Sequence, residues 1–128
     1  MYGYLDGQCP KSLDNQAAVF ATCHNDLNPW NVIVTEARWE TIDWEFVGNH
    51  DPLFDLVTLH QGLNLPGDEL FELCPKLDPQ STRARIEGNI KSYWLREGGW
   101  AKYQIQHGND REELQTQLEN AQAKVDAL

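Results

Sequence analysis

The chain contains the nonapeptide CHNDLNPWN at residues 23–31 and the tripeptide DWE at residues 43–45. In the first segment, the Asp26 carboxylate can accept a proton from a hydroxyl group. The Asn31 amide in the same segment supplies an oxygen atom to a cation, and Asp43 offers a second oxygen ligand. Oxygen atoms are the ligands that a hard cation such as magnesium prefers. The two segments therefore predict one polar site that contains a base and a metal ion.

A site of this kind is typical of phosphoryl transfer, which depends on positioning and charge neutralisation more than on covalent chemistry. Asp26 is the candidate base, and Asn31 and Asp43 are the candidate magnesium ligands. We group His24 with Asp26 as a catalytic-loop residue and expect it to act by packing and hydrogen bonding. Pro29 disfavours a helical conformation at the residue before it, so the loop should be irregular. Ordinary turn residues are the competing interpretation, because Asp and Asn favour turns.

Residues 32–42 are predicted to form a small β-hairpin, because a run of β-branched side chains is followed by a turn and then by residues of alternating polarity. A hairpin brings its two ends together. Asn31 and Asp43 flank this hairpin, so they should converge. The apolar run at residues 17–22 is expected to be a strand or the end of a helix that leads into the loop.

Beyond the hairpin the sequence pattern becomes helical. Asp51 and Pro52 form a helix-start signal, and apolar residues then recur every three or four positions until Gly62 and Pro66. Further helices are expected at residues 68–74, from an Asp78 cap to a break at Gly98–Gly99, and from a capping box of Asp110 and Glu113 to the C-terminus.

The overall composition indicates one domain with a modest core, since the chain has 128 residues of which 41% are apolar. A net charge of −10 should repel nucleic acid and anionic membranes and tolerate cationic ligands. Solubility alone is an equally good explanation of this acidity. The odd number of widely spaced cysteines (Cys9, Cys23 and Cys74) argues against a disulfide framework and favours a reducing cytoplasm. No signal peptide and no bilayer-spanning stretch is expected.

Three of these segments together resemble the aminoglycoside phosphotransferase and choline kinase superfamily, whose fold is related to that of protein kinases. They are residues 24–31, 42–45 and 51–56, and the resemblance is dense from Thr22 to Leu63. The fold that this implies is α+β and mainly helical. It is the C-terminal lobe of a protein-kinase-like fold, with a small β-hairpin next to the catalytic loop. A single such lobe would occupy residues 1–128, with a helical remainder from residue 51 onward.

The resemblance also implies residue roles. It makes Asp26 the catalytic base, Asn31 and Asp43 the magnesium ligands, and Asp55 the residue that braces the catalytic loop. Asn28 stands where protein kinases carry a lysine, and this departure favours small-molecule kinases. Glu45, Trp30 and Trp44 are candidate substrate or metal contacts. A solvated or structural role for Glu45 and a core role for the tryptophans are the alternatives.

The function implied is an ATP- and magnesium-dependent phosphotransferase that acts on a hydroxyl group of a small, cationic molecule. Choline, ethanolamine, thiamine and aminoglycosides are the acceptor classes that the resemblance suggests, and the choice among them stays open. Neither nucleic acid nor a membrane is expected as a partner.

The segment before the loop contains one lysine, Lys11, and no glycine-rich phosphate loop. We therefore expect the N-terminal nucleotide lobe to be absent, with weak nucleotide binding and little or no turnover in the isolated lobe. Such a chain would be a gene fragment, an engineered truncation or a naturally shortened protein. The competing hypothesis is a non-catalytic remnant that binds a ligand or self-associates through the exposed lobe interface.

Overall fold

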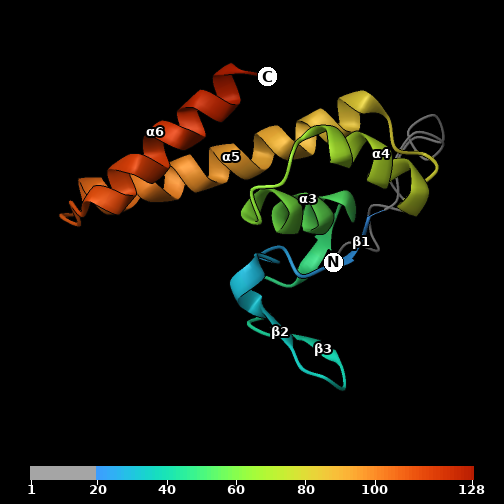
Figure 1. Cartoon of the computed structure of the whole chain (residues 1–128). Helices are drawn as coiled ribbons and strands as arrows, with labels where there is room; N and C mark the ends of the chain where they lie inside the picture. Colours follow the sequence, from blue (N-terminus) through green and yellow to red (C-terminus); the bar gives the residue numbers. More distant parts are fainter. Residues whose placement is uncertain (1–19) are drawn as a thin grey trace, which may run out of the picture. The chain divides into compact units, whose positions relative to one another are not determined.

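The computed structural model describes residues 20–128, so the turn-rich start of the chain, with Cys9 and Lys11, lies outside the described residues. The chain divides into two compact units, residues 1–81 and residues 82–128, and each is described by itself. Figure 1 gives the order of the elements along the chain. Within the described part, none of the helices is both long enough and apolar enough to cross a bilayer.

Two short antiparallel sheets frame the loop of the first unit. Strand β1 (Ala21–Cys23) pairs with β4 (Gly48–His50). Strand β2 (Val32–Val34) pairs with β3 (Trp39–Thr41), so the hairpin predicted over residues 32–42 is confirmed. The hairpin extends away from α3 in Figure 1, and the side chains of β3 are exposed. The nonapeptide therefore runs from the end of β1, through the 3-10 turn η1 (Pro29–Asn31), to the start of β2.

Helix α3 (Leu53–Gly62) follows β4 and carries much of the buried face of this unit. The Asp51 carboxylate accepts a hydrogen bond from the Leu53 N–H at 2.9 Å, as expected of a capping residue. The residue that follows the end of α3 differs from the prediction. The residue in the left-handed conformation is Asn64, with a φ of 55°, in the position that glycine often fills after a helix. Gly62 is thus not needed to end the helix.

Helix α4 (Asp68–Leu77) is longer than predicted, because it continues through Pro75. Proline removes one helical hydrogen bond. Leu70 and Cys74 are fully buried on this helix, so packing offsets that loss. The Asp78 N–H donates to the Cys74 carbonyl oxygen at 2.8 Å and closes the last turn.

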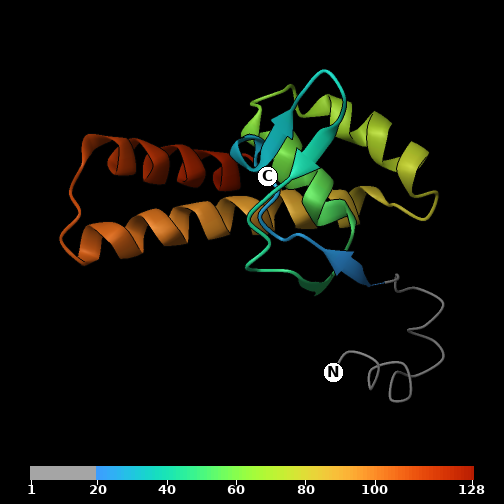
Figure 2. The ribbon, with the colours of Figure 1, turned by 90° about the horizontal axis from the view of Figure 1, so that it is seen from below.

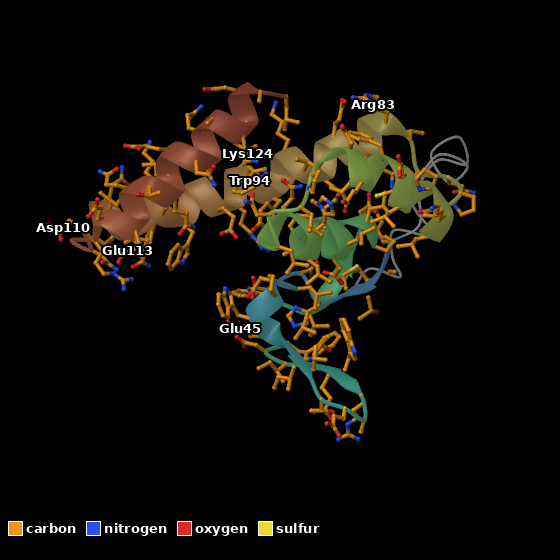
Figure 3. All side chains as sticks on the ribbon, viewed as in Figure 1. Glu45, Arg83, Trp94, Asp110, Glu113 and Lys124 are labelled. Carbon is orange, nitrogen blue, oxygen red and sulfur yellow. The ribbon has the colours of Figure 1, made fainter. Side chains whose placement is uncertain are left out.

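The second unit consists of α5 (Arg83–Gln106) and α6 (Glu112–Asp126). The predicted cap at Asp78 was wrong, because the Thr82 side chain accepts the hydrogen bond of the first turn of α5, from the Arg85 N–H at 3.2 Å. The Asp78 carboxylate instead accepts from the Gln80 N–H and forms a turn. The predicted capping box was also wrong, since α6 begins after Arg111 without a side-chain cap. Asp110 lies at the turn between α5 and α6, and Glu113 lies in the first turn of α6 (Figure 3).

The predicted break at Gly98–Gly99 was wrong as well, because α5 passes straight through it. Figures 1 and 2 show α6 returning alongside α5. A Cβ atom added at Gly98 would lie 3.1 Å from the Ala121 Cβ, so this glycine lets the two helices approach closely. Nearby, the Lys124 Nζ lies 5.6 Å from the centroid of the buried Trp94 ring (Figure 3). Helix pairing therefore outweighs the low helix propensity of two adjacent glycines.

We predict that Gly98→Leu destabilises the helix pair by about 1–3 kcal/mol relative to Gly99→Leu, because only the first substitution overpacks the interface. Gly99 is the matched control, since a Cβ atom there would meet nothing within 4 Å. Thermal unfolding followed by far-UV circular dichroism measures the difference. Equal unfolding temperatures for the two variants would contradict the close packing at Gly98.

Candidate functional site

The Asp55 carboxylate ties the nonapeptide loop to α3. Its Oδ2 accepts a hydrogen bond from the His24 N–H at 2.8 Å, and its Oδ1 accepts one from the Asn25 N–H at 2.9 Å. Hydrogen bonds to an ionised acceptor are among the strong ones in proteins. Asp55 also lies in the first turn of α3, where the helix dipole favours negative charge. The loop backbone is thus held at two successive residues by one side chain.

His24 connects the loop to the end of the hairpin. It is only 2% exposed, its Nε2 lies 2.7 Å from the Ile42 carbonyl oxygen, and its Nδ1 lies 3.1 Å from the Asp26 N. A carbonyl accepts and an N–H donates, so the two bonds require the neutral tautomer with its proton on Nε2. The Trp44 ring covers His24, with the ring centroids 4.6 Å apart. In this arrangement His24 orients the backbone of Asp26.

Asp26 and Asn31 lie together at the centre of the loop. The Asn31 Nδ2 donates to the Asp26 carbonyl oxygen at 2.9 Å and lies 3.5 Å from the Asp26 Oδ2. The Asn28 Nδ2 lies 3.4 Å from the other carboxylate oxygen. Because its Nδ2 is engaged with Asp26, the buried Asn31 side chain has Oδ1 available for a cation. Asp26 and Asn31, two of the predicted site residues, are therefore in direct contact.

Asp43 enters this neighbourhood through the base of the hairpin. The Ile42 N–H donates to the Asn31 carbonyl oxygen at 2.9 Å, and the Ile42 carbonyl oxygen accepts from His24. Asp43 follows directly and has a φ of 64°, a left-handed conformation that is uncommon for a residue with a side chain. Such conformations persist where the surrounding structure enforces them. The backbone on both sides of the hairpin thus meets at Asn31 and Ile42.

The other candidate contacts differ in exposure. Trp30 is 89% exposed, and Trp44 is 46% exposed with its indole N–H bonded to the Thr41 carbonyl oxygen at 3.0 Å. Glu45 is exposed and is labelled in Figure 3. The interpretation of Trp30 and Trp44 as core residues is therefore wrong. Trp94, in contrast, is buried.

Cys23 is a buried thiol at the start of the loop. Burial raises the pKa of Cys23, the nearby Asp55 carboxylate raises it further, and the hydrogen bond to the His50 carbonyl opposes them. Burial and the raised pKa both disfavour the thiolate, which is the form of cysteine that ligates metals and acts as a nucleophile. Across residues 20–128, no three His, Cys, Asp or Glu side chains gather as a metal cage.

Two further asparagines, Asn25 and Asn28, shape the loop, and no such role was predicted for either. The Asn28 side chain accepts from the Trp30 N–H at 3.0 Å and caps η1, and an Asn directly before a Pro is a signal that could have identified it. The Asn25 Nδ2 donates to the Phe46 carbonyl oxygen at 2.9 Å, and the Asn25 backbone has a φ of 69°. Its partner lies 21 residues away, so no local signal could have found this bond.

Comparisons with known proteins agree with the architecture. Residues 5–104 match APH, the phosphotransferase enzyme family. A segment of 51 residues is 41% identical to the protein LicA of Haemophilus influenzae, covering 40% of this chain and 19% of that protein. A second LicA sequence from this organism matches at the same identity over 15% of its length.

Two solved structures share the fold. A choline/ethanolamine kinase family protein from Mesorhizobium loti aligns with a TM-score of 0.67 at 23% identity, over 98% of this chain and 44% of that one. LicA in complex with AMP aligns with a TM-score of 0.61 at 22% identity, over the same shares of the two chains. The chain thus spans less than half the length of these relatives, and the expected mainly helical, kinase-like C-terminal lobe fold is confirmed.

We predict that Asp55→Asn destabilises the protein by about 1–3 kcal/mol, because the neutral amide offers one acceptor for two backbone N–H groups. Hydrogen exchange at the His24 and Asn25 amides, measured by NMR, should accelerate more than exchange elsewhere in the first unit. Asp68→Asn is the matched control, since it removes the same charge from an exposed position in a first helical turn. Unchanged protection of the two amides in Asp55→Asn would contradict the bracing role.

Proposed function

Because the chain belongs to the phosphotransferase enzyme family, we propose that it is the catalytic-loop lobe of an ATP- and magnesium-dependent kinase that phosphorylates a hydroxyl group of a small, cationic molecule. The observation that carries this proposal is the pairing of Asp26 and Asn31, whose side chains lie 3.5 Å apart on a loop anchored by Asp55. A carboxylate beside an amide side chain, whose own oxygen can bind a cation, offers a proton acceptor near a metal ligand, as phosphoryl transfer requires.

The donor set fits magnesium. Asn31 and Asp43 provide two oxygen ligands, and magnesium is commonly held by one or two carboxylates together with substrate phosphates. When bound, magnesium supplies charge neutralisation for the phosphates. The chain alone should therefore bind the free metal ion weakly.

Asp26 is proposed to orient the acceptor hydroxyl and to take its proton. The hydroxyl oxygen forms a bond to the γ-phosphorus of ATP, the bond from that phosphorus to the bridging oxygen breaks, and ADP leaves. His24 holds the backbone of Asp26, and Asn28 lies beside its carboxylate. These contacts keep the base in one orientation before the substrates bind, which is how positioning lowers the barrier.

The proposed substrate class rests on charge and on relatives. The net charge of −10 favours a cationic acceptor over an anionic one. One relative is described as a choline/ethanolamine kinase family protein, and LicA was solved in complex with AMP, which supports a cationic alcohol and an adenine nucleotide. Glu45 and the exposed Trp30 and Trp44 are the candidate contacts for the cation.

We predict that Asp26→Asn, in a complete enzyme that joins this lobe to a nucleotide lobe, lowers turnover by roughly 10²–10⁴-fold while the affinity for the nucleotide stays within about twofold. Asp43→Asn should instead weaken the magnesium-dependent part of ADP binding, read as a change in tryptophan fluorescence. Release of ADP with choline, ethanolamine, thiamine or an aminoglycoside as acceptor measures turnover, with Asp68→Asn as the control. Full activity of Asp26→Asn would show that the base is assigned wrongly.

A second candidate function is a non-catalytic module that self-associates. Among the described residues of the first unit, five aromatic side chains are at least 46% exposed, namely Phe20, Trp30, Trp39, Trp44 and Phe46. Exposed apolar residues in such numbers favour association with another surface. This candidate and the kinase make different demands on the protein, because association needs these aromatics and not the Asp26 carboxylate.

If the module self-associates, its apparent mass should rise with protein concentration in size-exclusion chromatography with light scattering. Trp39→Thr should reduce the rise, because it removes a side chain that is 73% exposed. Leu128→Thr is the control, at a residue that is 55% exposed in the second unit. A monomer at every concentration would exclude this candidate.

A further inference from the structure

The loop and α3 touch at a second point, far from Asp55. A Cβ atom added at Gly62 would lie 2.6 Å from the Pro29 Cδ and 3.3 Å from the Pro29 Cγ. Real Cβ atoms do not approach other heavy atoms that closely, so something would have to move. The proline ring is bonded to its own backbone at both ends and cannot swing aside as a long side chain can. The loop therefore rests directly against the backbone of α3 at Gly62.

Neither of the usual reasons for a glycine near a helix end applies at position 62. Gly62 is the last residue of α3 and is not among the described residues with a positive φ. The left-handed position after the helix belongs to Asn64. Glycine also lowers helix stability relative to alanine. The close approach of Pro29 is thus the property of this position that a larger residue could not supply.

The two contact points lie on one face of α3. Asp55 and Gly62 are seven residues apart, which places them within about 20° of each other around the helix and about 10 Å apart along it. Asp55 holds the loop at His24 and Asn25, and Gly62 seats it at Pro29. In the chain, Asp26 lies between these two anchors.

We propose that Gly62 is a positioning residue for Asp26 and Asn31. Pro29 is the first residue of η1 and Asn31 is the last, so a shift of Pro29 is carried to Asn31 through a single short turn. An alanine at position 62 would need to push the loop away by roughly 1 Å, and a displacement of that size can cost about 10²-fold in rate. The proposal rests on the proposed function only for its effect on turnover. The effect on loop geometry is independent of it.

The test compares Gly62→Ala with Gly67→Ala, a control at a site where an added Cβ atom would meet nothing within 4 Å. Pro29→Ala/Gly62→Ala is the rescue variant, because it removes the ring carbons that the new Cβ atom would meet. The readout is the NMR signals of the Asp26 amide and of the Asn31 side-chain NH₂ in the intact chain. Gly62→Ala should shift both signals, Gly67→Ala should leave them in place, and the double variant should return them towards their positions in Pro29→Ala.

Unshifted Asp26 and Asn31 signals in Gly62→Ala would overturn the proposal. The proposal would also fail if Gly62→Ala shifted the two signals equally in both backgrounds. The shift from Pro29→Ala to the double variant would then be as large as the shift from the parent to Gly62→Ala. Should Gly62→Ala not fold, a folded double variant supports the steric account, and an unfolded double variant beside a folded Pro29→Ala contradicts it. In a complete enzyme that joins this lobe to a nucleotide lobe, turnover of Gly62→Ala should fall about 10²-fold. If Gly62→Ala shifts both signals but the parent enzyme shows no phosphotransfer, the positioning role of Gly62 stands and the proposed function is refuted.

Discussion

The candidate site depends on one interaction, the bridge from the Asp55 carboxylate to the His24 and Asn25 N–H groups. A loop of irregular backbone has few hydrogen bonds of its own, and its conformation must be imposed by neighbours. Here the neighbour is the first turn of a helix whose other face is buried. The bridge therefore fixes the loop backbone at His24 and Asn25 to the first turn of α3.

From this bridge the order extends in two directions. Towards the hairpin, His24 binds the Ile42 carbonyl oxygen and the Asp26 N–H, and the Ile42 N–H binds Asn31. Along α3, the loop reaches Gly62, where the ring of Pro29 leaves no room for a side chain. Asp26 is thus held by the anchored backbone before it, by the His24 imidazole and by the turn η1 that follows it. A fixed orientation of this kind is what the role proposed for Asp26 demands.

Local chemistry in the sequence was enough to predict the parts of the site that are close in the chain. The β-branched run predicted the β2–β3 hairpin, and Asp51 predicted the start of α3. The roles of Asp26, Asn31 and Asp43 were predicted from side-chain chemistry and again from resemblance to a family, and that of Asp55 from the resemblance alone. These roles stay predictions, and the two hydrogen bonds of Asp55 to the loop backbone are observed. Tertiary packing decided the rest. Gly98 stays helical because α6 packs against it, and Pro75 stays helical beside buried Leu70 and Cys74. The pairing of β1 with β4 and the Gly62–Pro29 contact join distant segments, so no short pattern indicates them.

The central claim is that Asp26, Asn31 and Asp43 surround one metal–nucleotide site. Paramagnetic broadening of backbone amide signals by Mn²⁺, in the presence of ADP, tests it most directly. The account predicts that the amides of these three residues broaden together and before those of Glu36 and Glu40, two exposed acidic residues of the hairpin. Broadening that begins at the hairpin, or that affects Asp43 without Asp26 and Asn31, would contradict it.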